Sequence, residues 1–537
     1  MTGKHCTAIS LYVCLLLALL GVVTLIAATR WGIGVTTDPA KFMDAARNLS
    51  NGYGLVLRDS GEARPLTHHP PLYPVLLAVP GFFEIDPLDA ARWLHGILLG
   101  LNTLWVVLVV RRIAPGAFWP PILGALLMLF STTILNLHTV AFTEPLFLAW
   151  GFGGLGVLAA VQEWTSRAKP GSKHMIWGEA HPLFSSPMGW GGSAVLVALA
   201  LLTRYAGMAF VITGGLGIVL WSPGSFRRRV SRAALWGIIA VLPLSIWLGR
   251  NMLIAGNATN RRLDIHPVTW ERLESGLSTI SAWLLPWLAW DGLRALILLT
   301  VIVGWVVWGR KYVSCTVLKG VPSLVRLLVL FIPIYIGFLL LSISLFDFET
   351  PLDSRLLSPV YMAGLVVALW TAHRVLAAFP DHRGLRRMMA VIAAAFVLHA
   401  LLTGLSYLSR VYDEGQGYTG RAWQESRLVA EIRALPPDIL IYTNGPDAVH
   451  AVTGRPALRI PAEVMGGTLE PNATYAAELA EMRSQLIHEE GVLVYFRSIT
   501  WRWYLPTEAE LAAQLPLQVV ADAPDGTIYR VRGSESP

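Results

Sequence analysis

The sequence predicts a polytopic α-helical membrane protein of about eleven transmembrane helices, with a small C-terminal α/β domain outside the membrane. The 537-residue chain is 54% hydrophobic but only 14% charged, whereas soluble domains contain about 25% charged residues. Its apolar residues gather in runs long enough to cross a bilayer. From residue 411 onward the composition changes, and 17 acidic residues outnumber 10 basic ones. These features exclude a typical soluble enzyme and a disordered chain.

The first apolar run, residues 8–28, follows Lys4 and is longer than the core of a cleaved signal peptide. We therefore expect an uncleaved helix whose N-terminus is cytoplasmic. Residues 71–83 are too few to span unaided, which favours a re-entrant or interfacial segment over a spanning one. Further spans are expected at 93–110, 117–135, 144–161, 189–203, 207–221, 233–249, 292–309, 325–345, 356–378 and 388–408.

The basic residues between these spans agree with one topology. If residues 71–83 do not cross, five basic clusters between spans lie on the cytoplasmic side, where Lys and Arg collect. The clusters are Arg111 and Arg112; Arg167, Lys169 and Lys173; Arg227–Arg229 and Arg232; Arg310, Lys311 and Lys319; Arg383, Arg386 and Arg387. The pattern predicts a multi-pass plasma-membrane protein with an exoplasmic C-terminal domain, and it explains the net charge of +7 without a nucleic-acid partner.

Two regions outside the spans carry their own patterns. The first outer loop, residues 29–69, contains a helical periodicity over 41–49, with Asp38 as the expected N-cap and Pro39 at the first helical position. We expect this helix to lie on the membrane surface. The region 411–537 predicts strands at 438–442 and 491–496, a turn at 444–447, a helix from Ala448, and a hairpin of 518–521 with 527–531. The expected domains are therefore 1–410 and 411–537.

Ionisable residues at the outer ends of spans are the candidate site residues, because charge near a bilayer is costly and usually functional. The acidic candidates are Asp38, Asp44 and Glu144. Each has a structural alternative: Asp38 suits a helix cap, Asp44 a solvated helix face, and Glu144 an N-cap favoured by the helix dipole.

The cationic candidates are Arg204, Arg355, His68 and His69. Arg204 lies between two apolar runs and requires an anion, which is Glu144, Asp38 or a lipid phosphate. Arg355 has the same alternatives, with Asp347, Glu349 and Asp353 close in sequence. The adjacent histidines suit phosphate binding, proton transfer or metal ligation, or a polar, Pro-fixed approach to the membrane.

Five segments resemble integral-membrane glycosyltransferases of the GT-C class, most closely the protein-mannosyltransferase and aminoarabinose-transferase-like group. They are Asp38 in a long outer loop, His69-Pro-Pro-Leu-Tyr-Pro74, Thr143-Glu-Pro-Leu-Phe147, Leu202-Thr-Arg-Tyr-Ala-Gly207 and Ser354-Arg-Leu-Leu-Ser-Pro359. In the tail, Ile441-Tyr-Thr-Asn-Gly-Pro446 and Val452-Thr-Gly-Arg-Pro456 look like the outer domain of such proteins.

The resemblance implies transfer of a sugar from a polyprenyl-phosphate donor to a lipid, glycan or protein acceptor, usually with inversion. Asp38 matches the catalytic base, Asp44 or Glu144 a second acid on the acceptor side, and Arg204 and Arg355 positions near the donor phosphate. The family often has Asp-Glu where this chain has Asp38-Pro39, which weakens the case for a metal held by that pair. The sequence does not decide whether a divalent cation takes part. The alternative functions are a lipid or solute transporter and an inactive accessory subunit.

Overall fold

The computed structural model describes residues 3–167, 187–261, 263, 265–308, 320–346, 350–465 and 470–532. Several charged residues named above lie outside these ranges: Lys169, Lys173, Arg310, Lys311, Lys319, Asp347 and Glu349. The chain forms two compact units: one of residues 1–26, 94–138 and 143–409, and one of residues 27–93, 139–142 and 410–537. The first outer loop thus belongs with the C-terminal region, whereas the expected domains grouped it with the membrane helices.

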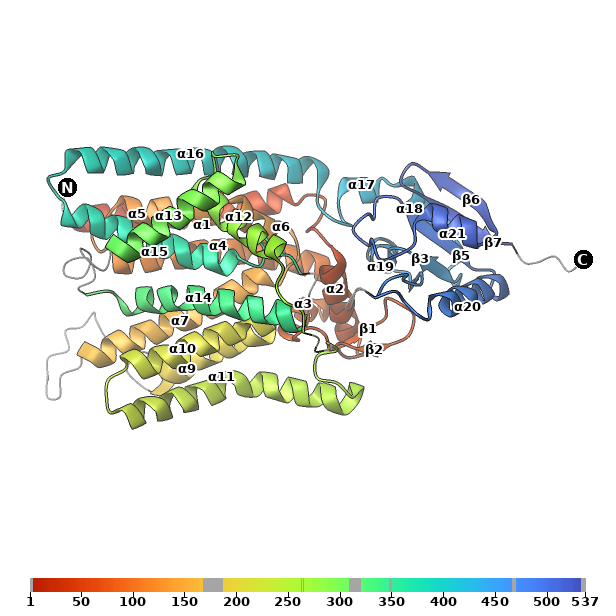
Figure 1. Cartoon of the computed structure of the whole chain (residues 1–537), viewed down its shortest axis with the longest axis horizontal. Coiled ribbons are helices and arrows are strands. Elements are labelled where there is room, and N and C mark those ends of the chain that lie inside the picture. Colours follow the sequence, from red (N-terminus) through yellow and green to blue (C-terminus); the bar gives the residue numbers. More distant parts are fainter. Residues whose placement is uncertain are drawn as a thin grey trace, which may run out of the picture. The chain divides into compact units, whose positions relative to one another are not determined.

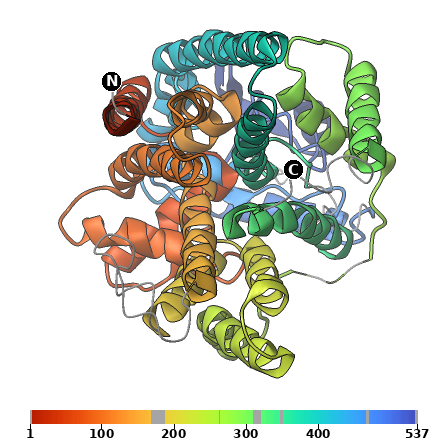
Figure 2. The same ribbon diagram turned by 90° about the vertical axis from the view of Figure 1, so that its left-hand side faces the viewer.

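The first unit is built from helices that run alongside one another (Figure 1) and are seen nearly end-on in Figure 2. The elements are α1 (Gly3–Ala28), α4 (Pro87–Ile113), α5 (Trp119–Leu129), α6 (Thr132–Thr139), α7 (Glu144–Arg167), α9 (Pro187–Thr203), the 3-10 turn η1 (Tyr205–Gly207), α10 (Met208–Trp221), α11 (Phe226–Ala255), α12 (Trp270–Leu284), α13 (Asp291–Trp308), α14 (Ser323–Leu345), α15 (Ser358–Ala378) and α16 (Arg383–Glu414).

The helices confirm a polytopic membrane protein. Within the described residues, seven are long and apolar enough to cross a bilayer, and the pair α5 and α6, bent by 52°, would make an eighth. Each of the eleven expected spans coincides with a helix or with this bent pair. Helices α9 and α10, with 17 and 14 residues, are shorter than the roughly 20 residues that a span needs. The count of eleven therefore stays a prediction.

Aromatic side chains hold α7, α10 and α14 together. The rings of Phe210 and Phe331 stack with centroids 4.5 Å apart, and Phe152 meets both edge-on. Gly151 makes this approach possible, because a Cβ added there would lie 2.1 Å from the ring of Phe210. Large buried aromatic contacts of this kind fix helices against one another. This packing sets the positions of the polar residues at the ends of α7 and α14.

The second unit contains a five-stranded sheet in the order β4-β3-β5-β7-β6. Strands β3, β4 and β5 are parallel, whereas β5, β7 and β6 pair antiparallel. The expected strands at 438–442 and 491–496 and the expected hairpin are present, with shifted ends. The bounds are β3 (Ile441–Thr443), β4 (Leu458–Arg459), β5 (Val492–Phe496), β6 (Leu517–Ala523), β7 (Gly526–Val531), α17 (Arg421–Gln424), α18 (Arg427–Ala434), α19 (Pro446–Thr453), α20 (Tyr475–His488) and α21 (Glu508–Gln514).

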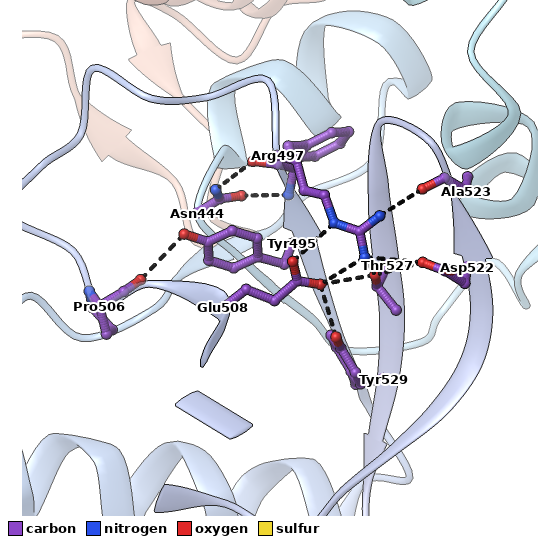
Figure 3. Close-up of polar contacts among 10 residues, drawn as sticks. Asn444, Tyr495, Arg497, Pro506, Glu508, Asp522, Ala523, Thr527 and Tyr529 are labelled. Carbon is purple, nitrogen blue, oxygen red and sulfur yellow. Dashed lines mark hydrogen bonds and ion pairs between the residues drawn. The ribbon is translucent and has the colours of Figure 1, made fainter. Parts of the chain in front are cut away.

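Helices cover both faces of this sheet, which makes a three-layer α/β arrangement. Val492 and Val494 of β5 face a core shared with α18 and α19. Leu493, between them, faces a second core shared with α20 and α21. The alternation follows from the two-residue period of a strand. A polar network around Arg497 joins the end of β5 to β6, β7 and α21 (Figure 3).

The first loop forms α2 (Thr37–Ser50), the hairpin of β1 (Val56–Leu57) with β2 (Arg64–Pro65), and α3 (Leu72–Gly81). Helix α3 has only ten residues, in keeping with the expectation that residues 71–83 are too short to span. The N-cap of α2 is Thr36 rather than Asp38, so the prediction of an Asp38 cap is wrong. Asp38 instead lies in the first turn, where a carboxylate also suits the helix dipole.

The sequence predicts that α2 lies on the membrane surface. In the structure, its apolar face packs against protein instead. Ala40 joins the core that includes Val449 of α19, and Ala45 packs against Leu57 and Leu66. The apolar face is therefore occupied by protein from the same unit. An amphipathic pattern predicts a buried face but does not identify what covers it.

Candidate functional site

The first unit contains a buried carboxylate that holds two arginines. Oε1 of Glu144, at the start of α7, lies 2.8 Å from Nη1 of Arg204 and 3.2 Å from Nη1 of Arg355. The Glu144 side chain is 2% exposed, and each arginine side chain is 22% exposed. The sequence left several possible anionic partners for Arg204 and Arg355. The structure places Glu144 beside both of them.

Breaks in the helices put these arginines in place. Arg204 is in an extended conformation between α9 and η1, and its Nη1 also donates to Oγ1 of Thr143 at 2.9 Å. Arg355 belongs to a turn before α15, in which the backbone N–H of Leu356 donates to Asp353. Tyr335 of α14 donates to the carbonyl of Leu356 at 2.9 Å. Backbone that leaves regular helix is tolerated at membrane depth only where protein or a cavity satisfies it.

The ion-paired group of Glu144, Arg204 and Arg355 carries one net positive charge. Breaking a buried pair is costly, because it leaves a charge without compensation. Guanidinium groups bind phosphate oxygens through paired N–H donors. The arrangement therefore provides two partly exposed guanidinium groups, held by one carboxylate, that suit a phosphate-containing anion.

Asp38 lies in the second unit beside a histidine and a lysine. Its Oδ1 is 3.6 Å from Nε2 of His69 and 3.7 Å from Nζ of Lys41, and its side chain is 44% exposed. The ring of His69 meets Phe42 edge-on, and the ring of His68 meets that of His69. Aromatic contacts thus fix His69 next to an accessible carboxylate. The sequence predicts Asp38 and His69 as site residues but does not indicate that they meet, or that Lys41 lies beside Asp38.

Asp44 is in a different environment from Asp38. Its side chain is buried, and its oxygens accept from Asn48, from the backbone N–H of Arg58 and from His450. Six residues separate the two carboxylates on one helix, so they point to different sides. The expected alternative of a solvated helix face is wrong, because the hairpin and α19 pack over Asp44.

A buried network that the sequence analysis missed anchors the beginning of α2. Asp447 pairs with Arg502, accepts from Tyr418 at 2.8 Å and hydrogen-bonds to Thr37, next to Asp38. Burial raises the pKa of Asp447, but the charge of Arg502 and these hydrogen bonds outweigh it and hold that pKa below 3.8. No local signal could have shown that residues so distant in sequence meet.

The second unit also contains an open cavity of about 500 Å³ beside the start of α2. Thr36, Thr37, Tyr418, Trp423 and Trp501 are among the residues that line it. Across the described part of the chain, no group of three or more His, Cys, Asp or Glu side chains is arranged to hold a metal ion.

Comparison with solved structures decides the fold. ArnT from Cupriavidus metallidurans bound to undecaprenyl phosphate matches with a TM-score of 0.56 and 10% identity, over 97% of this chain and 98% of that one. The chain has a GT-C fold. This GT-C fold also matches the oligosaccharyltransferase of Archaeoglobus fulgidus, tethered with an acceptor peptide (TM-score 0.52, 12% identity, 98% of this chain and 74% of that one). No protein-family model and no curated protein sequence matches it.

Proposed function

We propose that this protein is a membrane glycosyltransferase, which moves a sugar from a polyprenyl-phosphate donor to an acceptor hydroxyl. The observation that carries the proposal is the group of Glu144, Arg204 and Arg355 within a GT-C fold. Two arginines held by one buried carboxylate suit the phosphate of such a donor. The matched ArnT structure, which contains undecaprenyl phosphate, supports this class of donor.

In the proposed reaction, Asp38 takes the proton from the acceptor hydroxyl. The hydroxyl oxygen then attacks the anomeric carbon on the face opposite the phosphate, and the bond between that carbon and the phosphate oxygen breaks. The phosphate leaves with the electron pair, so the configuration inverts. Arg204 and Arg355 stabilise the charge that develops on the phosphate, as preorganised cations do. The accessible carboxylate of Asp38 suits a general base.

The remaining expected site residues have narrower proposed roles. His69 orients Asp38, because the two side chains are 3.6 Å apart; contact of His68 or His69 with the donor phosphate stays a proposal from the sequence. Glu144 holds the arginines. The buried contacts of Asp44 favour a structural role over that of a second acid.

We further propose that the protein lies in the plasma membrane, with its N-terminus cytoplasmic and residues 411–537 exoplasmic. The acceptor is then a lipid, glycan or protein on the outer face. The arrangement of basic clusters supports this orientation. Single cysteines introduced at exposed positions, such as Arg112 and Glu489, test this orientation in intact cells treated with an impermeant thiol reagent. Glu489→Cys is expected to react, and Arg112→Cys is not.

The decisive experiment is sugar transfer by the full chain in lipid, with a panel of polyprenyl-phosphate sugars. Transfer or slow donor hydrolysis is expected in the wild type and is expected to fall at least a hundredfold in Asp38→Asn. Asp413→Asn, which changes an exposed carboxylate of the same unit, is the matched control. Equal turnover in both variants would remove Asp38 as the base. No turnover with any donor, together with lipid or solute movement across the bilayer, would favour a transporter.

A further inference from the structure

The cavity beside the start of α2 has aromatic walls that the protein holds rigid. Trp423 meets Tyr418 edge-on at 5.0 Å and lies against Phe496 at 5.1 Å. Trp501 is 52% exposed, but the next residue, Arg502, is buried and paired with Asp447. The backbone that carries Trp501 is therefore anchored, while its ring remains accessible.

A glycine-rich segment of the cavity lining is bonded to the residues that lead into α2. The N–H of Tyr418 donates to the carbonyl of Val35 at 2.7 Å. Gly417 has a φ of +57°, and a Cβ there would lie 2.1 Å from the Val35 oxygen. Only glycine permits this approach. The wall is thus fixed to the residues that immediately precede Asp38.

The polar groups of the lining suit an uncharged ligand that carries hydroxyl groups. Thr36 lines the cavity at the N-cap of α2, yet its side chain makes no capping hydrogen bond. Glu414 is the only charged residue among the described lining residues, and none of them is basic. The lining therefore does not complement a phosphate, in contrast with the two arginines of the first unit.

We infer that this cavity binds a sugar residue of a neutral glycan acceptor. Ligand sites combine apolar and aromatic walls with a few polar groups, and a sugar ring offers both kinds of surface: C–H groups that pack on indole faces, and hydroxyls that bond to Thr36, Glu414 and backbone carbonyls. The location next to Asp38 places this site beside the proposed base. The inference rests on the proposed function and identifies its acceptor class.

Saturation-transfer NMR on the full-length protein in nanodiscs tests the inference, with methyl α-mannoside, mannotriose and arabinotriose as probes. Binding of at least one saccharide is expected, and its affinity is expected to fall about tenfold in Trp501→Ala, as loss of one aromatic contact predicts. Thr36→Val should weaken binding less, by about threefold. The control is Trp503→Ala, which removes a ring of similar exposure that is not part of the lining.

Two outcomes would overturn the inference: no saccharide binds, or Trp501→Ala and Trp503→Ala bind it equally. In the transfer assay, the KM for the saccharide should rise in Trp501→Ala without an equal rise in the KM for the donor lipid. Donor hydrolysis by the wild type, measured without saccharide, separates the two proposals. Hydrolysis without saccharide binding would reject the acceptor site and keep the transferase, whereas saccharide binding with neither transfer from any donor nor hydrolysis of it would reject the transferase alone.

Discussion

Nε2 of His450 lies 3.2 Å from Oδ1 of Asp44, which joins α19 of the C-terminal region to α2 of the first loop. Burial lowers the pKa of His450, but the hydrogen bond and charge of Asp44 outweigh it and raise that pKa above 6.5, against a small opposing effect of Arg47. Burial raises the pKa of Asp44, but bonds from His450 and from the backbone of Arg58 hold it below 3.8. Both side chains are therefore charged, and form an ion pair, between pH 3.8 and pH 6.5.

The first prediction is that this pair stabilises the second unit most between pH 3.8 and 6.5. The contribution of His450 is complete below its unfolded pKa and is lost as the pH rises through its raised folded value. The contribution of Asp44 is lost as the pH falls through its lowered folded value. His450→Leu should therefore lower the free energy of opening of α19 by about 1–3 kcal/mol at pH 6, and by less at pH 8.5.

Hydrogen–deuterium exchange of the α2 and α19 amides, corrected for the intrinsic pH dependence of exchange, measures this difference. His488→Leu, which replaces an exposed histidine of the same unit, is the control and should not change it. A loss in His450→Leu that is the same at pH 6 and pH 8.5 would show that packing, rather than charge, is responsible.

The second prediction concerns the charge balance around Glu144. Glu144→Gln removes a carboxylate that pairs with both Arg204 and Arg355, and raises the net charge of these three residues from one to two. The variant should unfold at a lower temperature, since two partly buried guanidinium groups lose the carboxylate that they share. Undecaprenyl phosphate should then raise its Tm more than it raises that of the wild type, because a bound phosphate replaces the missing charge.

Thermal unfolding in detergent, with undecaprenol as the uncharged control lipid, checks this expectation. Glu163→Gln is the matched variant, since Glu163 pairs with Arg112 elsewhere in the same unit. If undecaprenyl phosphate and undecaprenol shift the Tm of Glu144→Gln equally, the two arginines do not bind the phosphate.

The third prediction separates the two adjacent histidines. His69 is 3.6 Å from Asp38, and the ring of His68 meets the ring of His69 rather than the carboxylate. His69→Gln should lower kcat about tenfold, because an unoriented carboxylate is a poorer base, and His68→Gln should change kcat less than twofold. Steady-state transfer kinetics measure both variants. An equal rise in the KM for the donor lipid in both would instead return the histidines to the donor-phosphate role expected from the sequence.

Hydropathy located the helices of this protein well, since a segment that crosses lipid must be apolar over its whole length. Strand β5 and the hairpin of β6 with β7 were also predictable, because short β-branched runs between turn residues have few alternatives. The contacts of the site were not predictable. Glu144 accepts from arginines 60 and 211 residues away in sequence, and Asp44 meets His450 406 residues later.

Local sequence also gave wrong predictions for α2, whose interaction partners are distant in sequence. Asp38 followed by Pro39 resembles the beginning of a helix, yet α2 begins before Asp38 because Val35 and Thr37 are bonded to Tyr418 and Asp447 of the C-terminal region. The apolar face of α2 indicated a membrane surface, because the residues that cover it, such as Val449 of α19, are distant in sequence. A sequence pattern indicates that a face is buried, but the residue that covers it depends on the tertiary fold.

The last prediction concerns Arg497, which donates to Glu508, Asp522 and Thr527 at the edge of the sheet (Figure 3). Tyr529 donates to Glu508 at 2.7 Å, so β7 and α21 are joined through one carboxylate. Burial raises the pKa of Glu508, but Arg497 and these hydroxyls outweigh it and hold that pKa below 4.5. Glu508→Gln should therefore reduce the protection of β7 amides from exchange at pH 7 by about 1 kcal/mol. Because the pKa of Glu508 is lowered, the difference should shrink as the pH falls through the folded value of that pKa.

Glu510→Gln is the control variant. It removes the partner of Thr507 in the α21 capping box and should loosen that helix end without exposing β7. Equal exposure of β7 in both variants would show that the Arg497 network does not hold the strand.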